Sequence, residues 1–195
     1  MRKIFYILIL IYLLFISLNP LNAKDILPII EGDKNSKINL VIYESLTCSH
    51  CGEFHRNVYP KLKEEFIDKG LVNIEFRNFP LDLAALNASK IAHCKNDGLS
   101  NTLHFLYQNQ ERWVKGNNIL EVNNNLMKLL EIEEININFE KCVNDKTIEN
   151  FILEERIDGS KKYEIEATPT LIINEKKFDK QLNYKNLKKT LKKML

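Results

Sequence analysis

Two stretches in the first half of the chain have the side-chain pattern of β-strands. Residues 38–43 are mostly apolar, are rich in β-branched side chains and follow turn-forming residues at 32–36, which predicts a buried central strand. In residues 72–77 apolar and polar side chains alternate, and Pro80 follows, which predicts a second strand. These two strands begin the sheet of the predicted fold.

A helix is predicted between these two strands. Large apolar residues recur there at four-residue spacing, namely Phe54, Val58, Leu62 and Phe66. The pattern stops at Gly70, a residue type that commonly ends helices, and Pro60 inside the pattern is expected to kink the helix. The order strand, helix, strand predicts a βαβ unit with a right-handed crossover.

The middle of the chain, residues 82–145, shows no strand pattern. Its apolar residues predict several helices, at residues 83–94, 99–107 and 119–130 and around Phe139. We interpret this region as an all-helical insertion. Three of its side chains are expected to be structural rather than ligands, because no partner of metal-binding or catalytic type stands at a fixed offset from them. They are His93, His104 and Trp113.

The last part of the chain returns to mixed helical and strand character. It predicts, in order, a helix at 147–162, an apolar strand at 171–173, a hairpin strand at 176–178 and an amphipathic helix at 183–195. The predicted fold class is therefore α/β. Residues 24–81 and 146–195 form one domain, and residues 82–145 are inserted into it.

Residues 1–23 have the pattern of an export signal. Two basic residues precede an apolar stretch at 4–18, which is shorter than the roughly 20 residues that a membrane span needs. The cleavage signal before Lys24 is weak because Leu21 stands at its third position back, so an uncleaved membrane anchor is the alternative. Either arrangement places the body of the protein outside the cytoplasm, and we expect the periplasm.

The charge balance gives no electrostatic case for nucleic acid. The first 23 residues hold two of the 28 basic residues and none of the 26 acidic ones. Bases and acids therefore balance in the remainder, which favours neither nucleic-acid nor membrane-surface binding.

The chemistry of the chain centres on two cysteines spaced C-x-x-C, Cys48 and Cys51, directly after the first strand. A strand that ends before a helix beginning near Ser49 places Cys48 at a helix N-terminus, where unpaired backbone N–H groups and the helix dipole stabilise a thiolate. The pKa of Cys48 should then fall below its free value of about 8.5. Cys51, one turn deeper, is predicted to be the resolving thiol.

His50 lies between the two cysteines and is predicted to favour the Cys48 thiolate through positive charge and hydrogen bonding. A zinc site is the alternative reading of the motif. It would need two further ligands at metal-finger spacing, and only His50 itself and His55 are near. We therefore predict a redox pair and no metal.

Cys94 and Cys142 complete an even number of cysteines in an exported chain, which favours a disulfide between them. Loop entropy would make that bond worth about 3 to 5 kcal/mol, less any strain. The alternative is two separate buried thiols that fill the core.

Three motifs together resemble the DsbA-like thiol:disulfide oxidoreductases: residues 46–51, residues 77–80 and Ala167-Thr168-Pro169-Thr170. The resemblance covers almost the whole chain after residue 23. It implies a thioredoxin fold split by an inserted helical domain, and no cofactor. It also implies a cis peptide bond between Thr168 and Pro169, next to the Cys48–Cys51 pair, where the Thr168 backbone pairs with a substrate strand.

The resemblance implies a dithiol oxidase that introduces disulfides into reduced, unfolded exported proteins. Ser49 stands where the oxidases usually have proline, and Thr168 is more typical of isomerases and reductases, so an isomerase or reductase is the alternative. A periplasmic metal carrier is a more distant one. We expect a monomer; whether a membrane quinone-linked protein re-oxidises it, and whether Glu44 accepts the proton of Cys51, stay open.

Overall fold

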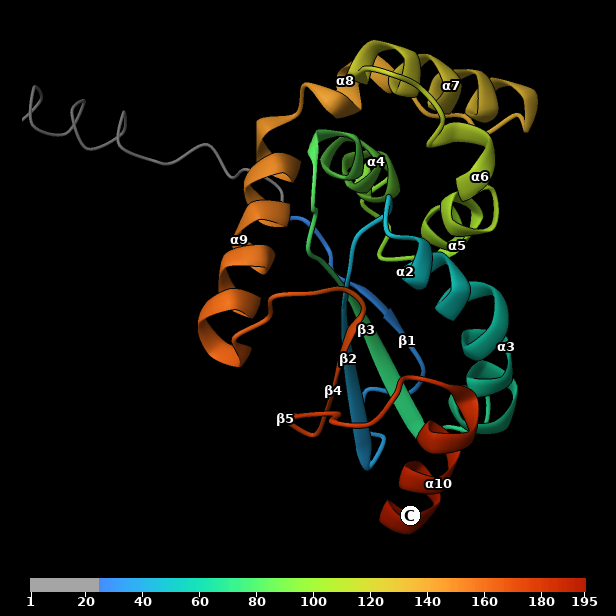
Figure 1. Ribbon diagram of the computed structural model, residues 1–195, viewed down its shortest axis with the longest axis vertical. Helices are drawn as coiled ribbons and strands as arrows, with labels where there is room; N and C mark the ends of the chain where they lie inside the picture. Colours follow the sequence, from blue (N-terminus) through green and yellow to red (C-terminus); the bar gives the residue numbers. More distant parts are fainter. Residues whose placement is uncertain (1–24) are drawn as a thin grey trace, which may run out of the picture.

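The computed structural model describes residues 25–195, so the predicted export signal lies outside the described residues (Figure 1). Its centre is a five-stranded sheet in the order β1-β3-β2-β4-β5. The strands are β1 (Ile29–Glu31), β2 (Ile38–Glu44), β3 (Val72–Asn78), β4 (Thr170–Ile173) and β5 (Lys176–Lys177). Strands β2 and β3 are parallel, and the other pairs are antiparallel. The predicted central strand, parallel pair and hairpin are confirmed.

The connection from β2 to β3 is a helical segment with two π-helical stretches. Its parts are α2 (Ser49–Glu53), η1 (Phe54–Val58), α3 (Tyr59–Leu62) and η2 (Lys63–Ile67). Pro60 lies at the start of α3. Since proline has no backbone N–H, it cannot continue the hydrogen-bond ladder, and the helix is irregular where a kink was predicted. The side chains of Phe54, Leu62 and Phe66 are buried in the core.

The remaining helices surround the sheet. They are α4 (Leu83–His93), α5 (Asn101–Gln108), α6 (Gln110–Trp113), α7 (Ile119–Ile132), α8 (Phe139–Val143), α9 (Lys146–Tyr163) and α10 (Tyr184–Met194). Helices α4 to α8 lie beyond the end of the sheet at which the chain leaves β2 and β3, with α9 along one side and α3 and α10 along the other (Figure 1).

Polar side chains fix where many of these helices begin. An aspartate or asparagine at the N-cap accepts a backbone N–H from the first turn in five of the described helices, at Asp82, Asn118, Asn138, Asp145 and Asn183. Such caps satisfy N–H groups that have no partner inside the helix. Two elements, β1 and α6, were not predicted, because three or four residues are too few to show a periodicity.

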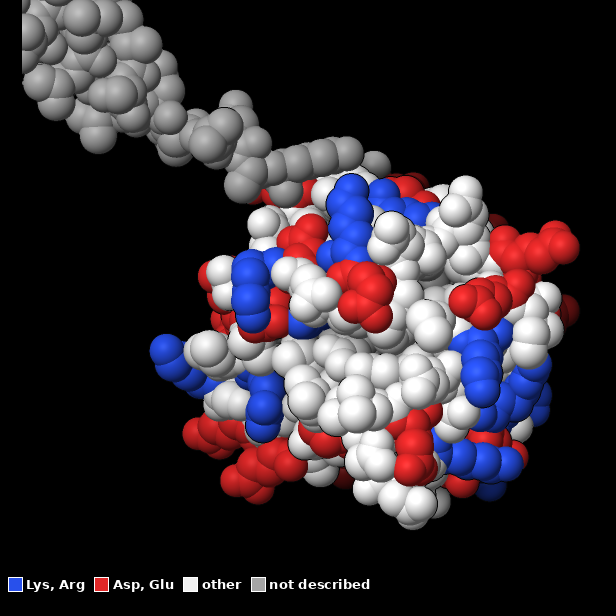
Figure 2. Space-filling view, turned by 90° about the horizontal axis from the view of Figure 1, so that it is seen from above, with Lys and Arg blue, Asp and Glu red and all other residues white. Residues whose placement is uncertain are grey.

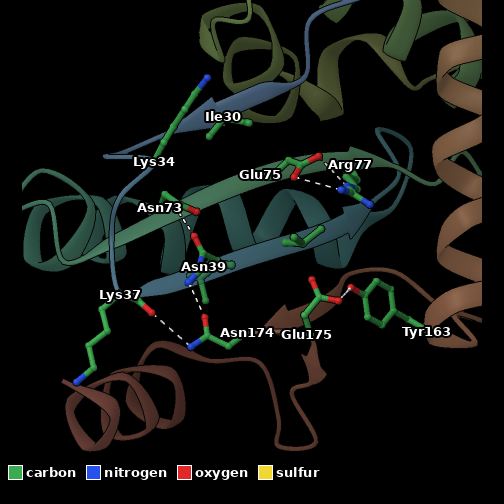
Figure 3. A pocket seen from close by; sticks show the side chains of 12 residues that line it. Ile30, Lys34, Lys37, Asn39, Asn73, Glu75, Arg77, Tyr163, Asn174 and Glu175 are labelled. Atoms are coloured by element: carbon green, nitrogen blue, oxygen red, sulfur yellow. Dashed lines mark hydrogen bonds and ion pairs between the residues drawn. The ribbon is translucent and has the colours of Figure 1, made fainter.

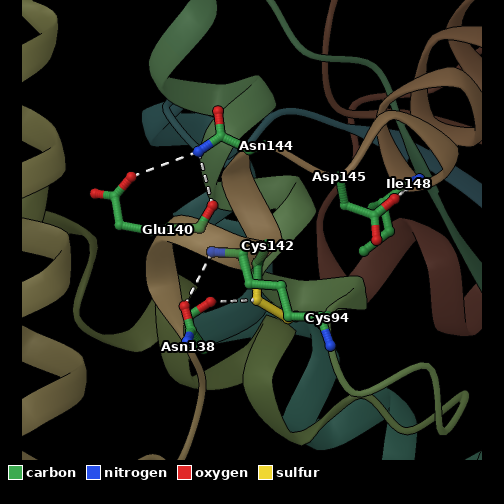
Figure 4. Close-up of a disulfide and its surroundings, with 8 residues drawn as sticks. Cys94, Asn138, Glu140, Cys142, Asn144, Asp145 and Ile148 are labelled. Atoms are coloured by element: carbon green, nitrogen blue, oxygen red, sulfur yellow. Dashed lines mark hydrogen bonds between the residues drawn. A yellow bond between two sulfur atoms is a disulfide. The ribbon is translucent and has the colours of Figure 1, made fainter.

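A disulfide joins Cys94, just after α4, to Cys142 in α8, with 5.5 Å between their Cα atoms (Figure 4). Close to it, the buried Lys90 ammonium donates to the Val143 carbonyl and forms an ion pair with Glu149 at the start of α9. These contacts tie α4 to α8 and α9. Within residues 25–195, no helix is both long enough and apolar enough to cross a bilayer.

Candidate redox site

The loop after β2 delivers Cys48 to the first turn of a helix. Cys48 is the N-cap residue of α2, with extended backbone angles, and its N–H donates to the Ser45 carbonyl at 3.0 Å. The Gly52 N–H donates to the Cys48 carbonyl at 3.1 Å and so closes the first turn. The helix N-terminal position predicted for Cys48 is therefore observed.

The two thiols of the motif differ in exposure. Both are free in the structure, and Cys48 is half-buried whereas Cys51 is fully buried in the core. A hydrogen bond from the Cys51 thiol lowers the pKa of Cys48 to about 5, with further help from the backbone N–H groups of Cys51 and His50, and burial opposes the change. Cys48 is thus a thiolate at neutral pH and is open to an approaching partner.

Cys51 has the opposite protonation. Burial raises the pKa of Cys51 far above its ordinary value, and the hydrogen bond to Cys48 and the charge of Glu44 act in the same direction. It therefore remains a neutral thiol beside the Cys48 thiolate. Before Cys51 can attack a disulfide at Cys48, it must give up its proton.

The residues after α9 reach back to the exposed cysteine. The peptide bond between Thr168 and Pro169 is cis, and Cys48 Sγ lies 3.3 Å from the Thr168 carbonyl oxygen. Pro169 has no N–H to compete for hydrogen bonds there. Both predicted substrate-binding residues thus lie beside the thiolate.

His50 is turned away from the sulfurs. Its side chain is 75% exposed, and its Nδ1 lies 3.2 Å from a carboxylate oxygen of Glu53. The His50 backbone N–H, rather than the imidazole, is the group that acts on Cys48. A part for the imidazole in the reaction stays a prediction.

A family model described as Thioredoxin matches residues 24–193. The chain belongs to the thioredoxin family. The crystal structure of Wolbachia pipientis alpha-DsbA1 is 30% identical, with a TM-score of 0.76 over 91% of this chain and 94% of that one. The fold is therefore a DsbA-like thioredoxin fold with a helical insertion, as the sequence motifs predicted.

Two curated relatives agree with this family. A protein-disulfide oxidoreductase of Rickettsia bellii is 30% identical over 147 residues, which make up 73% of this chain and 55% of the relative. Disulfide bond formation protein D of Bacillus subtilis is 26% identical over 175 residues, or 84% of this chain and 75% of that protein. The chain spans about half the length of its Rickettsia relatives.

Gln110, in the unpredicted helix α6, is a part of this DsbA-like site that the sequence did not reveal. Its Nε2 donates to the carbonyls of Leu46 and Cys48, at 2.8 and 2.9 Å, and so fixes the loop before the motif. A Cβ added at Gly52 would meet the Gln110 amide oxygen. No local pattern connects residues so far apart in the chain.

The buried acid Glu44 lies at the end of β2 and pairs with His55, whose Nε2 is 2.9 Å away. Burial raises the pKa of Glu44 well above its ordinary value. The sequence left the part of Glu44 open and gave no role to His55 or Glu31. Among residues 25–195, no three His, Cys, Asp or Glu side chains are placed to hold a metal ion.

A surface pocket and the distribution of surface charge do not involve the two cysteines. A pocket of about 510 Å³ lies over one face of the sheet, between side chains such as Asn39, Asn73 and Arg77, and neither cysteine of the motif lines it (Figure 3). On the face seen from the end of α7 and α8, basic and acidic side chains are interspersed (Figure 2).

Proposed function

We propose that the protein is an extracytoplasmic thiol:disulfide oxidoreductase that introduces disulfides into exported proteins through the Cys48–Cys51 pair. The observation that carries this proposal is the pairing of a half-exposed Cys48, whose pKa is lowered to about 5, with a buried, protonated Cys51. One thiol is built to exchange with a partner, and the other to resolve the product.

In the oxidised protein, a substrate thiolate attacks the Cys48 sulfur. The Cys48–Cys51 bond breaks, the electron pair goes to Cys51, and Cys51 takes up a proton. A second substrate thiolate then attacks the substrate sulfur of the mixed disulfide. The new substrate disulfide forms, and Cys48 leaves as a thiolate, which its low pKa makes a good leaving group.

Thr168 and Pro169 are proposed to hold the substrate during this exchange. An extended peptide would pair with the Thr168 backbone beside the sulfur. Asp82 accepts a hydrogen bond from Thr47 of the cysteine loop at 2.7 Å. Its two neighbours in the sequence, Leu81 and Leu83, have exposed apolar side chains. An unfolded chain offers apolar segments that suit such a surface.

The proposal extends to the setting of the protein. Its substrates would be reduced, unfolded exported proteins in the periplasm, it would act as a monomer, and a membrane quinone-linked protein would restore the disulfide. An isomerase or reductase of the same fold is the second candidate, because Thr168 precedes the cis proline. These functions differ in the direction of electron flow.

The reduction potential of the Cys48–Cys51 couple tests the proposal, measured in a variant with Cys94 and Cys142 changed to serine. A value near about −120 mV would support an oxidase, and one between about −180 and −270 mV an isomerase or reductase. The absence of a reversible couple would refute both. In addition, Cys51→Ala should trap exported proteins as mixed disulfides at Cys48, and Cys48→Ala should trap none.

A further inference from the structure

Two buried and two half-buried side chains form an unbroken row of hydrogen bonds that starts at Glu44, four residues before Cys48. Glu44 Oε2 lies 2.9 Å from His55 Nε2, His55 Nδ1 lies 2.9 Å from His104 Nδ1, and His104 Nε2 lies 2.7 Å from Glu31 Oε1. Both ring nitrogens of each histidine are used, so each imidazole links two neighbours. Such a row can pass a proton along its whole length.

The four members come from four elements that only the fold brings together. Glu44 ends β2, His55 lies in η1, His104 in α5 and Glu31 ends β1. Aromatic rings hold both imidazoles in place: Tyr107 stacks on His55 at 3.9 Å between centroids, and Tyr59 stacks on His104 at 4.1 Å. Their ring planes are therefore fixed relative to the hydrogen bonds.

The two ends of the row lie in different environments. The side chains of Glu44 and His55 are 3% and 1% exposed, and Glu44 in its ionised form raises the pKa of Cys51. The side chains of His104 and Glu31 are 13% and 14% exposed, and both line a surface pocket of about 490 Å³. The row thus runs from the buried Glu44, which influences the resolving cysteine, to the surface.

The protonation states fit a single direction of donation. Burial raises the pKa of Glu44 and lowers those of His55 and His104, which favours the neutral form of the acid and of both imidazoles. Burial opposes ionisation of Glu31, but hydrogen bonds from His104, Ser100 and Tyr59 lower its pKa to about 2. Glu44 then donates to His55, His55 to His104, and His104 to the Glu31 carboxylate.

Two cations from neighbouring helical segments face this row. Lys63 Nζ lies 3.7 Å from Glu31 Oε2, and the charge of Arg56 disfavours protonation of His55. Lys63 favours the ionised Glu31 carboxylate, which is the acceptor for His104, and Arg56 disfavours a proton held on His55.

We propose that Glu44, His55, His104 and Glu31 are a proton relay that carries the proton of Cys51 to and from the surface pocket. This inference rests on the proposed function, because only a resolving cysteine must lose and regain a proton in each cycle. The four residues are positioning residues that act through Cys51.

The relay accounts for the proton that Cys51 loses when the disulfide closes. Glu44 first passes its proton to His55, His55 passes one to His104, His104 passes one to Glu31, and Glu31 releases a proton to water. The Cys51 proton then moves to Glu44, and the Cys51 thiolate attacks Cys48 in the mixed disulfide. The Cys48–Cys51 bond forms, and the partner sulfur leaves with the electron pair of the broken bond. Reduction runs these transfers backwards.

The experiment follows the two steps of closure separately. The full chain, reduced only at Cys48 and Cys51, is mixed with dithionitrobenzoate in a stopped-flow absorbance instrument. Attack by Cys48 releases the first thionitrobenzoate at a rate that depends on the reagent concentration. Closure by Cys51 releases the second at a rate that does not, so the two rates are resolved within one trace.

His104→Ala is the test variant, because it interrupts the relay at its solvent-facing half. We expect the first release to be unchanged and the second to slow by about a hundredfold, the lower end of what general acid–base catalysis contributes. Added imidazole should restore the second rate, since the space left by the ring adjoins the surface pocket. A merely structural role would not be rescued in this way.

His93→Gln is the matched control. His93 is a second buried histidine of the helical insertion, and its Nε2 lies 2.8 Å from the Asn78 amide nitrogen, outside the relay. Its closure rate should equal that of the wild type. If His104→Ala fails to fold, the second release is measured in His104→Gln instead. Glutamine retains a hydrogen-bonding side chain but cannot carry a proton, so slow closure is again expected.

The outcomes separate the relay from the function on which it rests. A normal second release in the His104 variants would overturn the relay and leave the proposed function intact. Equal slowing in His93→Gln, or slowing that imidazole does not relieve in His104→Ala, would also overturn it. If the wild type releases no thionitrobenzoate from Cys48, the proposed function itself fails.

Discussion

The Cys51 thiol is the largest single stabiliser of the Cys48 thiolate, and its removal gives a sharp prediction. The hydrogen bond from Cys51 contributes more to the low pKa of Cys48 than the backbone N–H groups of the helix do. Cys51→Ala removes this donor and leaves the helix N-terminus as it is. We therefore expect a higher pKa at Cys48 in the variant.

The size of this change follows from the strength of the bond. Hydrogen bonds to charged groups are worth roughly 1.5 to 3 kcal/mol, and a pKa change of one corresponds to about 1.36 kcal/mol. Because Cys48 is only half-buried, solvent weakens the interaction and the lower figure applies. The pKa of Cys48 should rise by about 1, from about 5 in the wild type.

Thiolate absorbance in the ultraviolet, titrated against pH, measures this change directly. Cys51→Ser is the matched control, because its hydroxyl keeps a donor at the same position, and it should show a smaller rise than Cys51→Ala. If Cys51→Ala leaves the pKa of Cys48 at about 5, groups other than the Cys51 thiol stabilise the thiolate, and the part assigned to the Cys51 donor is wrong.

Four further predictions concern the surroundings of the site. His50→Leu should raise the pKa of Cys48 by less than the loss of the thiol donor does, because the imidazole is exposed and its backbone N–H remains; a larger rise in the same titration would restore the imidazole to the mechanism. In the reduced protein, folding lowers the pKa of Cys48 from 9.0 to about 5, so the thiolate stabilises the fold fully above pH 9 and this stabilisation is lost as the pH falls through about 5. We halve the corresponding free energy because Cys48 is partly exposed. Compared with Cys48→Ser in urea unfolding, the free energy of unfolding of the wild type should therefore rise by about 2 to 3 kcal/mol between pH 4 and pH 9. Peptide mass mapping without reduction should join Cys94 to Cys142, and changing both to serine should cost about 2 to 4 kcal/mol in the free energy of unfolding; free thiols would contradict the pairing. Gly52→Ala should lower the denaturation midpoint, since its Cβ has no space, and an unchanged midpoint would mean that the neighbouring amide moves at little cost.

The sequence predicted those parts of the fold that depend on local pattern. The parallel strands β2 and β3 and the long helix α9 carry enough residues to show their periodicity, and the β4–β5 hairpin has an apolar run followed by a turn. Strand β1 is too short for this, and its pairing with β3 depends on a contact between distant parts of the chain. Glu31 was therefore invisible as a site residue, because it stands on that strand.

The candidate site divides in the same way. Cys48 and Cys51 are three residues apart, so their roles could be predicted from helix geometry, and a family resemblance supplied Thr168 and Pro169. His104 was interpreted as a packed side chain because it has no partner at a fixed offset. In the fold it meets His55 and Glu31 at hydrogen-bonding distance. Networks between distant residues leave no mark on spacing.

The redox character of the pair follows mainly from the charge on Cys48. At pH 7 a thiol whose pKa is about 5 is stabilised as a thiolate by up to about 2.7 kcal/mol, or about half of that after allowance for exposure. This stabilisation exists only in the reduced protein, so it shifts the couple toward oxidation of substrates by about 30 mV. Cys51 contributes to this shift through the hydrogen bond that it donates to Cys48, and not through a charge of its own, since it stays a neutral thiol. Its other contribution is kinetic: the proton that Cys51 holds must leave before the disulfide can close.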